Sequence, residues 1–353
     1  AVQKLTPRWA PSPRDGLKLM RILMITQHVR ESVQAVPLAA GCIKAALSSE
    51  QQQQTEIINL YPPLDIELIC QQLLDKEPDL IAFSLSLWSR IPLLALARRL
   101  RTLQPRLFLL GGGPETAGNC AELISAGGLD GVIRGEGELA CAALVDSLNR
   151  GHLMAGIDGF VSAAAALADP PAATCPDLAS LPSPWLTGAL PLEPGCGVLW
   201  EVARGCHFNC SFCYDAKGHQ GVRPFPLESL RQELKLFAES EVSQIWILDS
   251  TFNAPAQRGH DLLQLLLDVA PQIHYHIEAK ADLLDNRTIE LLAQLSCSVQ
   301  IGLQSARPEI LKPLQRRIDP HQMRQVLHQL NLAGIVFGLD LIYGLPGDNH
   351  QGF

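Results

Sequence analysis

The stretch Cys206-His207-Phe208-Asn209-Cys210-Ser211-Phe212-Cys213 places three cysteines in a CxxxCxxC spacing. It directly follows an apolar run, residues 198–203, that leads into Arg204-Gly205. Structural zinc sites and electron-transfer clusters normally use four protein ligands, so a loop with three thiols leaves one metal position open. An open position is where a bound metal can do chemistry. The stretch therefore predicts a catalytic metal or iron–sulfur centre.

Around this loop, short apolar runs alternate with helical patterns. Strands are predicted over residues 198–203, 244–248, 274–278, 298–303 and 336–343, and helices over residues 227–240, 257–269, 287–294 and 321–333. This alternation is typical of a parallel sheet covered by helices, with the active site where the carboxyl ends of the strands meet. The half from residue 198 onward is therefore predicted to be an α/β domain with five βα units.

The first half of the chain shows the same alternation. Strands are predicted over residues 22–26, 56–59, 80–85, 107–110 and 131–134. The helices between them are predicted at residues 37–48, 66–75 and 92–105, from about residue 118, and at about residues 138–149. Five such units predict a doubly wound, flavodoxin-like domain whose ligand crevice lies beyond the carboxyl ends of its strands.

Glycine-rich loops follow two of those strands. They read Gly111-Gly112-Gly113-Pro114-Glu115 and Arg134-Gly135-Glu136-Gly137-Glu138, and Ser84 and Ser86 add hydroxyls at a neighbouring strand end. Glycine allows a large flat ligand or a phosphate to approach the backbone closely. Taken alone, the loops fit a nucleotide-free Rossmann domain equally well.

Prolines interrupt the Ala-rich sequence between the two halves, so residues 152–197 are predicted to be a semi-rigid linker without long helices or central strands. The predicted order is an extension over residues 1–20, an α/β domain over 21–151, this linker, and a second α/β domain over 198–353.

The composition restricts the cellular compartments and the partners that fit this chain. The net charge of −8, without a basic stripe, argues against nucleic acid as the main partner. No apolar run approaches the ~18 residues of a membrane span, and the first twenty residues lack the apolar segment of a secretory signal. Ten cysteines are too sparse for a disulfide-stapled secreted fold. We therefore expect a cytoplasmic protein with reduced thiols and no membrane span.

The CxxxCxxC loop, with Phe212 before its last cysteine, resembles the fingerprint of the radical S-adenosylmethionine (radical SAM) superfamily. Four further runs follow in the order of that superfamily's motifs, at residues 247–253, 276–284, 301–305 and 340–348. The resemblance implies a (β/α)6 TIM-type barrel in which Cys206, Cys210 and Cys213 hold a 4Fe–4S cluster and S-adenosylmethionine binds the fourth iron. Reductive cleavage of S-adenosylmethionine would then release a 5′-deoxyadenosyl radical, with the cofactor carrying the hard chemistry.

The same resemblance implies which side chains meet S-adenosylmethionine. Asp249 stands where the superfamily binds the amino end of the cofactor, although the usual Gly-Gly-Glu is absent. Glu278 and Gln304 end the third and fourth strands, and for both a solvated polar residue is the alternative. Gly344 belongs to a GxIxGLPG-like motif whose backbone packs on adenine, and Phe212 is counted with these contacts.

Three runs of the first half, at residues 81–88, 107–118 and 129–138, resemble the cobalamin-binding domain that precedes many radical SAM enzymes. The resemblance implies that Ser84, Gly111, Gly112 and Gly113 line the nucleotide tail of the corrinoid. It also implies that the turn with Glu136 closes the domain.

One departure concerns the ligand below cobalt. His28 keeps its place in the cobalt-binding Asp-x-His-x-x-Gly loop, but Thr26 replaces the aspartate that would orient it. The favoured interpretation is a loop histidine without a metal, and relatives with radical chemistry often lack a lower histidine.

The resemblance covers about residues 21 to 353 and ends after the fifth strand of a six-stranded barrel. The sequence is therefore expected to be a C-terminally truncated piece of a longer protein with a partial barrel.

The implied function is that of a cobalamin-dependent radical SAM enzyme, with methyl transfer the commonest outcome in such enzymes. Its implied partners are a small-molecule or peptide substrate and a flavodoxin- or ferredoxin-type electron donor. Two alternatives stay open. One is a radical SAM enzyme whose first domain is a docking scaffold without cobalamin. The other is a non-catalytic iron–sulfur or zinc protein, in which His207 or His219 would complete a zinc site.

Overall fold

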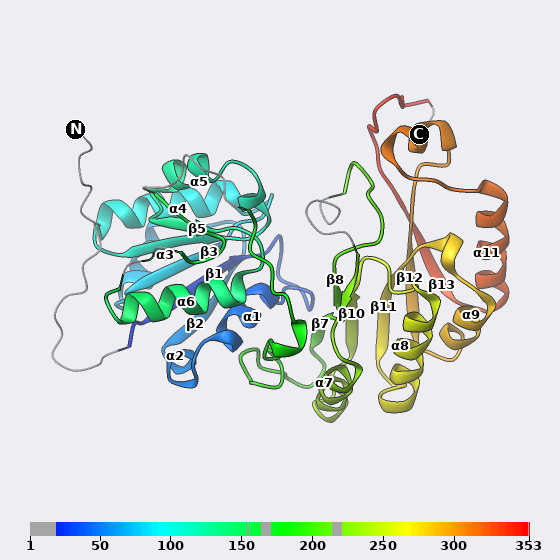
Figure 1. Ribbon diagram of the computed structural model, residues 1–353, viewed down its shortest axis with the longest axis horizontal. Coiled ribbons are helices and arrows are strands. Elements are labelled where there is room, and N and C mark those ends of the chain that lie inside the picture. The colour runs from blue at the N-terminus through cyan, green and yellow to red at the C-terminus, as the bar shows by residue number, and fades with distance from the viewer. Residues whose placement is uncertain (1–18, 153, 155, 164–170, 214–220, 352) are drawn as a thin grey trace. The chain divides into compact units, whose positions relative to one another are not determined.

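A computed structural model describes residues 19–152, 154, 156–163, 171–213, 221–351 and 353. The chain forms two compact units, Ala1–Pro191 and Leu192–Phe353, which we call the N-unit and the C-unit (Figure 1). Each unit is built around a mainly parallel β-sheet, which confirms the predicted α/β fold class. His219, the alternative zinc ligand, lies outside the described residues.

The N-unit holds a six-stranded sheet in the order β2-β1-β3-β4-β5-β6. The strands are β1 (Ile22–Gln27), β2 (Thr55–Leu60), β3 (Leu80–Ser84), β4 (Phe108–Gly112), β5 (Gly131–Ile133) and β6 (Phe160–Ser162). The first five are parallel, and β6 runs antiparallel to β5. Since β6 falls where the sequence predicted a linker, the region contributes one short edge strand, which is compatible with its prolines.

Two apolar cores lie on opposite faces of this sheet. Along β1, Leu23 and Ile25 join the core under α3 (Ile66–Leu74), α4 (Arg90–Leu103) and α5 (Cys120–Gly127). Ile22 and Met24 point the other way, into the core under α1 (Leu38–Ala46) and α6 (Gly137–Asn149). Because successive side chains of a strand alternate between faces, a nearly continuous apolar run is what a doubly covered strand requires.

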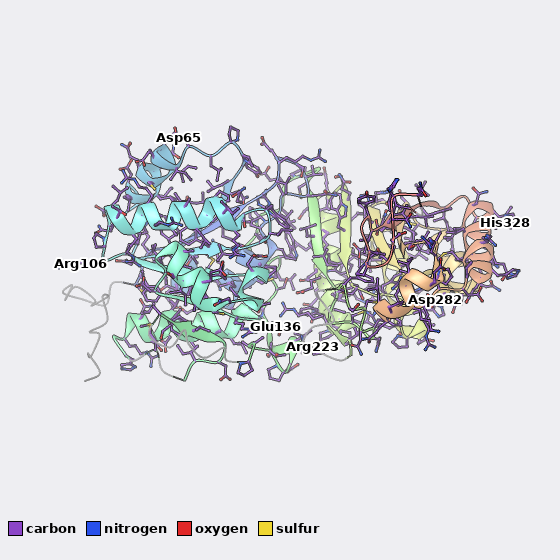
Figure 2. The ribbon with its side chains drawn as sticks, turned by 90° about the horizontal axis from the view of Figure 1, so that it is seen from above. Asp65, Arg106, Glu136, Arg223, Asp282 and His328 are labelled. Carbon is purple, nitrogen blue, oxygen red and sulfur yellow. The ribbon has the colours of Figure 1, made fainter. Side chains whose placement is uncertain are left out.

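Helix caps mark where the loops of the N-unit end. Asp65, labelled in Figure 2, accepts a hydrogen bond from the Leu68 N–H at the start of α3. Ser48 caps the short α2 (Ser49–Gln53) and Asn119 caps α5 in the same way. Such caps satisfy donors that the first helical turn leaves free.

The connections of β1 and β3 leave the sheet toward opposite faces, through α1 and α4 respectively. Because β1 and β3 are neighbours, the carboxyl ends of these strands form the topological switch point of the N-unit. In open α/β sheets this is where ligands bind.

The C-unit holds a five-stranded parallel sheet in the order β13-β12-β11-β10-β7. The strands are β7 (Gly197–Glu201), β10 (Gln244–Leu248), β11 (His274–Ala279), β12 (Cys297–Gln304) and β13 (Val336–Leu341). The helices are α7 (Leu227–Glu239), α8 (Ala256–Val269), α9 (Asn286–Leu292), α10 (Pro308–Leu311) and α11 (Pro320–Leu332). This sequential order is that of a partial barrel, as the sequence predicted.

The two faces of the C-unit sheet differ in polarity. On the helix side, Trp200 of β7 is fully buried and donates its indole N–H to Glu233 of α7 at 2.7 Å. Ile245, Ile247 and Tyr275 are also buried, while their neighbours along the strands, such as Trp246 and His276, are only partly covered. The second face therefore carries polar and aromatic side chains that a closed helix-covered core would not need.

The predicted strand over residues 198–203 is shorter than expected. β7 ends at Glu201, and the next N–H, that of Val202, bonds to the Leu248 carbonyl. Ala203–Arg204 then form β8, which pairs with β9 (Arg223–Pro224) in a small antiparallel ribbon. This ribbon brackets the cysteine loop.

Among the described residues, none of the helices combines the length and the apolar composition that a bilayer crossing needs.

Candidate active site

The cysteine loop lies between β8 and β9, beyond the carboxyl end of β7. Cys206 and Cys210 are buried, Cys213 is partly exposed, and all three thiols are free. Gly205 enters the loop with φ of +86°, and a Cβ there would lie 2.5 Å from the Gly221 carbonyl oxygen. Glycine is therefore required at the neck of the loop, both for its backbone conformation and for the space.

The donor chemistry of the loop fits a thiolate-bound metal cluster. Within the part of the chain that the structure describes, however, no group of three or more His, Cys, Asp or Glu side chains is close enough together to hold a metal ion. The three thiols share one loop, over residues 206–213.

Phe212 packs the loop against residues at and after α10, late in the sequence of the C-unit. Its ring packs on a small apolar cluster of Ile310, Leu311, Leu314 and Leu345, and the neighbouring Ser211 N–H donates to the Leu314 carbonyl at 3.0 Å. The adjacent Gly344 has φ of +81°, and a Cβ at this position would meet nothing within 4 Å. The loop and the glycine motif that the sequence analysis paired are therefore neighbours, with open space beside Gly344.

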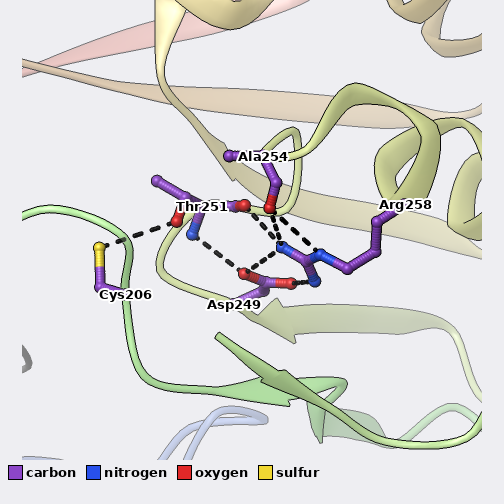
Figure 3. Close-up of polar contacts among 5 residues, drawn as sticks. All are labelled: Cys206, Asp249, Thr251, Ala254 and Arg258. Atoms are coloured by element: carbon purple, nitrogen blue, oxygen red, sulfur yellow. Dashed lines mark hydrogen bonds and ion pairs between the residues drawn. The ribbon is translucent and has the colours of Figure 1, made fainter. Parts of the chain in front are cut away.

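Asp249 follows β10 and lies in a buried ion pair (Figure 3). Its carboxylate binds the Arg258 guanidinium through both oxygens and accepts the Thr251 N–H at 3.0 Å. The side chain of Asp249 is 1% exposed. Its predicted contact with the amino end of a cofactor stays a prediction, and the structure shows that the carboxylate already serves the loop that follows β10.

Lys280 is a site residue that the sequence analysis missed. It follows β11, is buried, pairs with Asp282 (labelled in Figure 2), and holds its ammonium 4.7 Å from the centre of the Phe208 ring in the cysteine loop. The Asn253 side chain donates to the Lys280 carbonyl at 3.0 Å. The available signal was a lysine directly after a predicted strand. Its burial, which distinguishes it from a surface lysine, cannot be read from the motif alone.

Glu278 and Gln304 occupy the strand ends where the sequence analysis placed them. Glu278 is exposed at the carboxyl end of β11. Gln304 closes β12 with φ of +67°, beside an irregular register step after Gly302, and its carbonyl accepts the Ile342 N–H at 2.9 Å. A non-glycine residue in this conformation carries backbone strain, a property found disproportionately at binding sites. Their contacts with a cofactor stay predictions.

In the N-unit, the glycine loop after β4 lies at the switch-point edge of the sheet. Gly113 has φ of +104°, and a Cβ there would lie 2.7 Å from the Leu85 carbonyl oxygen. A Cβ on Gly112 would meet nothing, whereas one on Gly111 would press on Leu129. Gly112 therefore faces open space, and Gly113 makes the turn that presents it.

Ser84, at the end of β3, receives the Ser89 hydroxyl on its carbonyl at 2.9 Å. Glu136 has a structural task as well, because its carboxylate accepts the Cys175 N–H at 2.6 Å. His28 bonds to the Asn59 side chain at 3.1 Å and stacks on Tyr61. An amide oxygen thus orients the imidazole, and the roles of Ser84 and Glu136 at a corrinoid stay predictions.

A cluster of exposed apolar side chains, which the sequence analysis did not identify, follows β1 and β3 at the switch point. We call Val29, Leu87, Trp88 and Ile91 the apolar rim; their exposed fractions lie between 55% and 83%. The Trp88 indole N–H donates to the Gln27 carbonyl at 3.0 Å and joins the two loops. Exposed apolar surface beside a glycine turn fits a large, flat, largely hydrocarbon ligand.

Comparison with known proteins gives two family matches that together cover most of the chain. The profile of the radical SAM superfamily matches residues 200–353, and that of the B12 binding domain matches residues 32–145. The first match begins at the strand before the cysteine loop. The second includes the glycine turn and the apolar rim except Val29.

Several curated proteins are similar over nearly the full chain. An uncharacterized methyltransferase of Pyrococcus horikoshii is 24% identical over 95% of this chain and 76% of its own length. The cobalamin-dependent radical SAM methyltransferase TokK of Streptomyces tokunonensis is 24% identical over 90% of this chain. A 2-(S-pantetheinyl)-carbapenam-3-carboxylate methyltransferase of Streptantibioticus cattleyicolor is 23% identical over 97% of it. The chain spans only 50% and 53% of the length of these last two relatives.

Solved structures share the fold. TsrM, a radical S-adenosylmethionine methyltransferase of Kitasatospora setae, superposes with a TM-score of 0.73 at 18% identity, over 94% of this chain and 69% of its own. OxsB, a cobalamin-dependent S-adenosylmethionine radical enzyme, gives a TM-score of 0.73 at 17% identity, over 92% of this chain and 50% of its own. Both units of the chain are therefore represented in single known polypeptides.

Proposed function

We propose that this chain, which belongs to the radical SAM superfamily and carries a B12-binding domain ahead of its radical SAM domain, is a cobalamin-dependent radical SAM methyltransferase. The observation that carries the proposal is the cysteine loop: three free thiols beyond the carboxyl end of β7, within the segment that matches the superfamily. The similarity to TokK, which is named as a cobalamin-dependent radical SAM methyltransferase, supports methyl transfer as the reaction.

In this proposal Cys206, Cys210 and Cys213 hold a 4Fe–4S cluster to which S-adenosylmethionine also binds. When bound, this pair supplies a 5′-deoxyadenosyl radical after one-electron reduction. The chain's own residues position and shield it: Cys206 and Cys210 lie in a buried part of the loop, Phe212 anchors the loop, and Gly344 leaves room beside it. Glu278 and Gln304 are the proposed polar contacts to S-adenosylmethionine at the ends of β11 and β12.

Cobalamin would bind to the N-unit at the switch point. The open side of Gly112, the turn at Gly113 and the hydroxyl of Ser84 would face its nucleotide tail, with Gly111 packed beneath them. The apolar rim would cover apolar surface of the macrocycle, and His28, held by Asn59, would stay outside the cobalt coordination. When bound there, cobalamin would supply the methyl group for the transfer.

The substrate is proposed to be a small molecule, because two relatives that cover at least three quarters of this chain are named for methylation of a carbapenam and of a hopanoid. The electron is proposed to come from a low-potential flavodoxin or ferredoxin, and the reduced thiols suit a cytoplasmic setting. The domain limits 21–151 and 198–353 are likewise proposed for the cobalamin-binding and the radical SAM parts.

Anaerobic reconstitution with iron and sulfide tests the proposal. With S-adenosylmethionine and dithionite, the loaded protein should release 5′-deoxyadenosine, and hydroxocobalamin should bind with a change in visible absorbance. A protein that holds a full cluster and makes no 5′-deoxyadenosine would contradict the enzyme assignment. Turnover without cobalamin binding would favour the docking-scaffold alternative instead.

A further inference from the structure

The sulfur of Cys206 has a hydrogen-bond partner inside the protein. Cys206 Sγ lies 3.7 Å from the hydroxyl oxygen of Thr251, in the loop after β10 (Figure 3). Both residues are buried, with exposed fractions of 9% and 4%. A hydroxyl excluded from water beside a sulfur is a contact whose energy the protein environment strengthens.

The direction of this hydrogen bond follows from the proton inventory. A cysteine that ligates a metal does so as a thiolate and has no S–H to donate. A threonine hydroxyl has one proton to give. Once Cys206 ligates iron, Thr251 must therefore be the donor and Cys206 the acceptor.

Thr251 is held on both sides of its backbone. Its N–H donates to the Asp249 carboxylate at 3.0 Å, and its carbonyl accepts from Arg258 Nη2 at 2.6 Å. Arg258 also donates to the Ala254 carbonyl at 3.2 Å, so one guanidinium closes the whole turn (Figure 3). Because Arg258 sits in the first turn of α8, the helix fixes the position of the turn.

The ion pair beneath this turn is well shielded. The side chains of Asp249 and Arg258 are 1% and 18% exposed. A bidentate pair of this kind gives geometric specificity as well as attraction. Its structural effect is to hold the backbone of the residue whose hydroxyl contacts Cys206 Sγ.

We propose that Thr251 donates a hydrogen bond to the Cys206 thiolate and so favours reduction of the bound cluster, with Asp249 and Arg258 as the positioning residues that hold Thr251. This inference rests on the proposed function, since it needs an iron–sulfur cluster on the loop. One electron enters from a low-potential donor, no covalent bond forms or breaks at Thr251, and its proton stays on the oxygen. A donor to a ligating sulfur stabilises the more negative, reduced cluster and raises its potential.

The test compares loaded forms of the whole chain. Thr251→Val and Thr251→Ala remove the hydroxyl, Thr251→Ser restores it, and Thr288→Val removes another buried hydroxyl of the same unit, one bonded to Asp285. Each protein is reconstituted anaerobically, its iron and sulfide are counted, and its midpoint potential is measured by a dithionite titration followed by electron paramagnetic resonance.

The expected result is a tenfold lower equilibrium constant for reduction in Thr251→Val and Thr251→Ala, which is a shift of about 59 mV for one electron. Thr251→Ser and Thr288→Val should stay within about twofold of the wild type. Asp249→Glu, which keeps the charge but displaces the turn, should shift the potential in the same direction by about threefold, because the hydrogen bond it supports is weakened but not removed.

Wild-type potentials in a fully loaded Thr251→Val or Thr251→Ala protein would overturn the inference while leaving the proposed function intact. A wild-type protein that binds no cluster would overturn both. An equal decrease in the midpoint potential of Thr288→Val and Thr251→Val would also contradict the inference. Removing any buried threonine hydroxyl of the unit would then have the same effect.

Discussion

The two units solve the problem of holding a cofactor in different ways. In the N-unit, the candidate site is mostly backbone and apolar surface: the turn at Gly113, the open side of Gly112 and the apolar rim. In the C-unit, it is made of reactive and charged side chains, with thiols backed by a buried ion pair. A site of the first kind recognises its ligand by shape. A site of the second kind holds its ligand by charge and by metal coordination. Substitutions should therefore fail differently in the two units.

The largest expected effect comes from removing a thiol. Cys206→Ala should lower 5′-deoxyadenosine formation by at least about 100-fold, because the cofactor carries the chemistry and no other residue replaces its ligand. Iron content after reconstitution and product release are the measurements. Cys297→Ala is the matched control, since Cys297 is a buried free thiol of the same unit whose Sγ donates to the Leu292 carbonyl at 3.5 Å. Equal losses in both variants would remove the distinction between thiols.

Breaking the ion pair of the C-unit should mainly affect stability. Arg258→Met leaves the buried Asp249 carboxylate without its cation, which should cost about 3–5 kcal/mol in the free energy of unfolding. Urea unfolding followed by circular dichroism measures the loss. Arg287→Met, on an exposed pair with Glu290, should cost at most about 1 kcal/mol. A similar small loss in both would mean that the pair at Asp249 adds no stability.

Breaking the glycine turn of the N-unit should mainly affect ligand binding. Gly113→Ala forces a side chain against the Leu85 carbonyl in a conformation that only glycine adopts easily, at about 1–3 kcal/mol. Hydroxocobalamin should then bind about tenfold more weakly, by absorbance titration. Gly188→Ala is the control, because Gly188 also has a positive φ but its Cβ would meet nothing. Unchanged affinity in Gly113→Ala would contradict the backbone-built site.

The smallest expected effect concerns pH and the polar face of the C-unit sheet. Burial, and then the neighbouring His274, lower the pKa of His276 below its ordinary 6.5. The folded chain therefore binds fewer protons than the unfolded chain between these two pKa values, so stability is complete above about pH 6.5 and falls as the pH drops toward the folded pKa. The urea midpoint should be lower at pH 5.5 than at 7.5, and less so in His276→Gln. Identical pH dependence in both proteins would assign the effect to other groups.

Sequence patterns located the elements of both units because the short apolar runs of the strands and the helical patterns between them are both strong. The strand at Gln244–Leu248 alternates Ile245 and Ile247 with polar or aromatic neighbours, and the structure places this strand at the predicted residues. By contrast, β6 was hidden in a proline-rich region. A three-residue edge strand is selected by the neighbouring β5, and its own sequence carries little signal.

The candidate site was legible only where the chemistry lies in consecutive residues. The three cysteines and the glycine turn could be read directly. Asp249 was found as a strand-end carboxylate, but its partner Arg258 lies in the next helix, and only the fold brings the two together. Leu87, Trp88 and Ile91 were not identified, because their exposure depends on the folded arrangement of the loops and cannot be read from residue type.

The strand β13 gives the C-unit a practical property in solution. It lies at the edge of the sheet, and Val336, Leu341 and the nearby Tyr343 are each more than half exposed. An unpaired strand edge with apolar side chains is a template for intermolecular pairing. Light scattering of residues 1–353 should therefore show association that grows with concentration, and Leu339→Lys should suppress it. The protein concentration at which the chain is handled and stored will therefore depend on this edge.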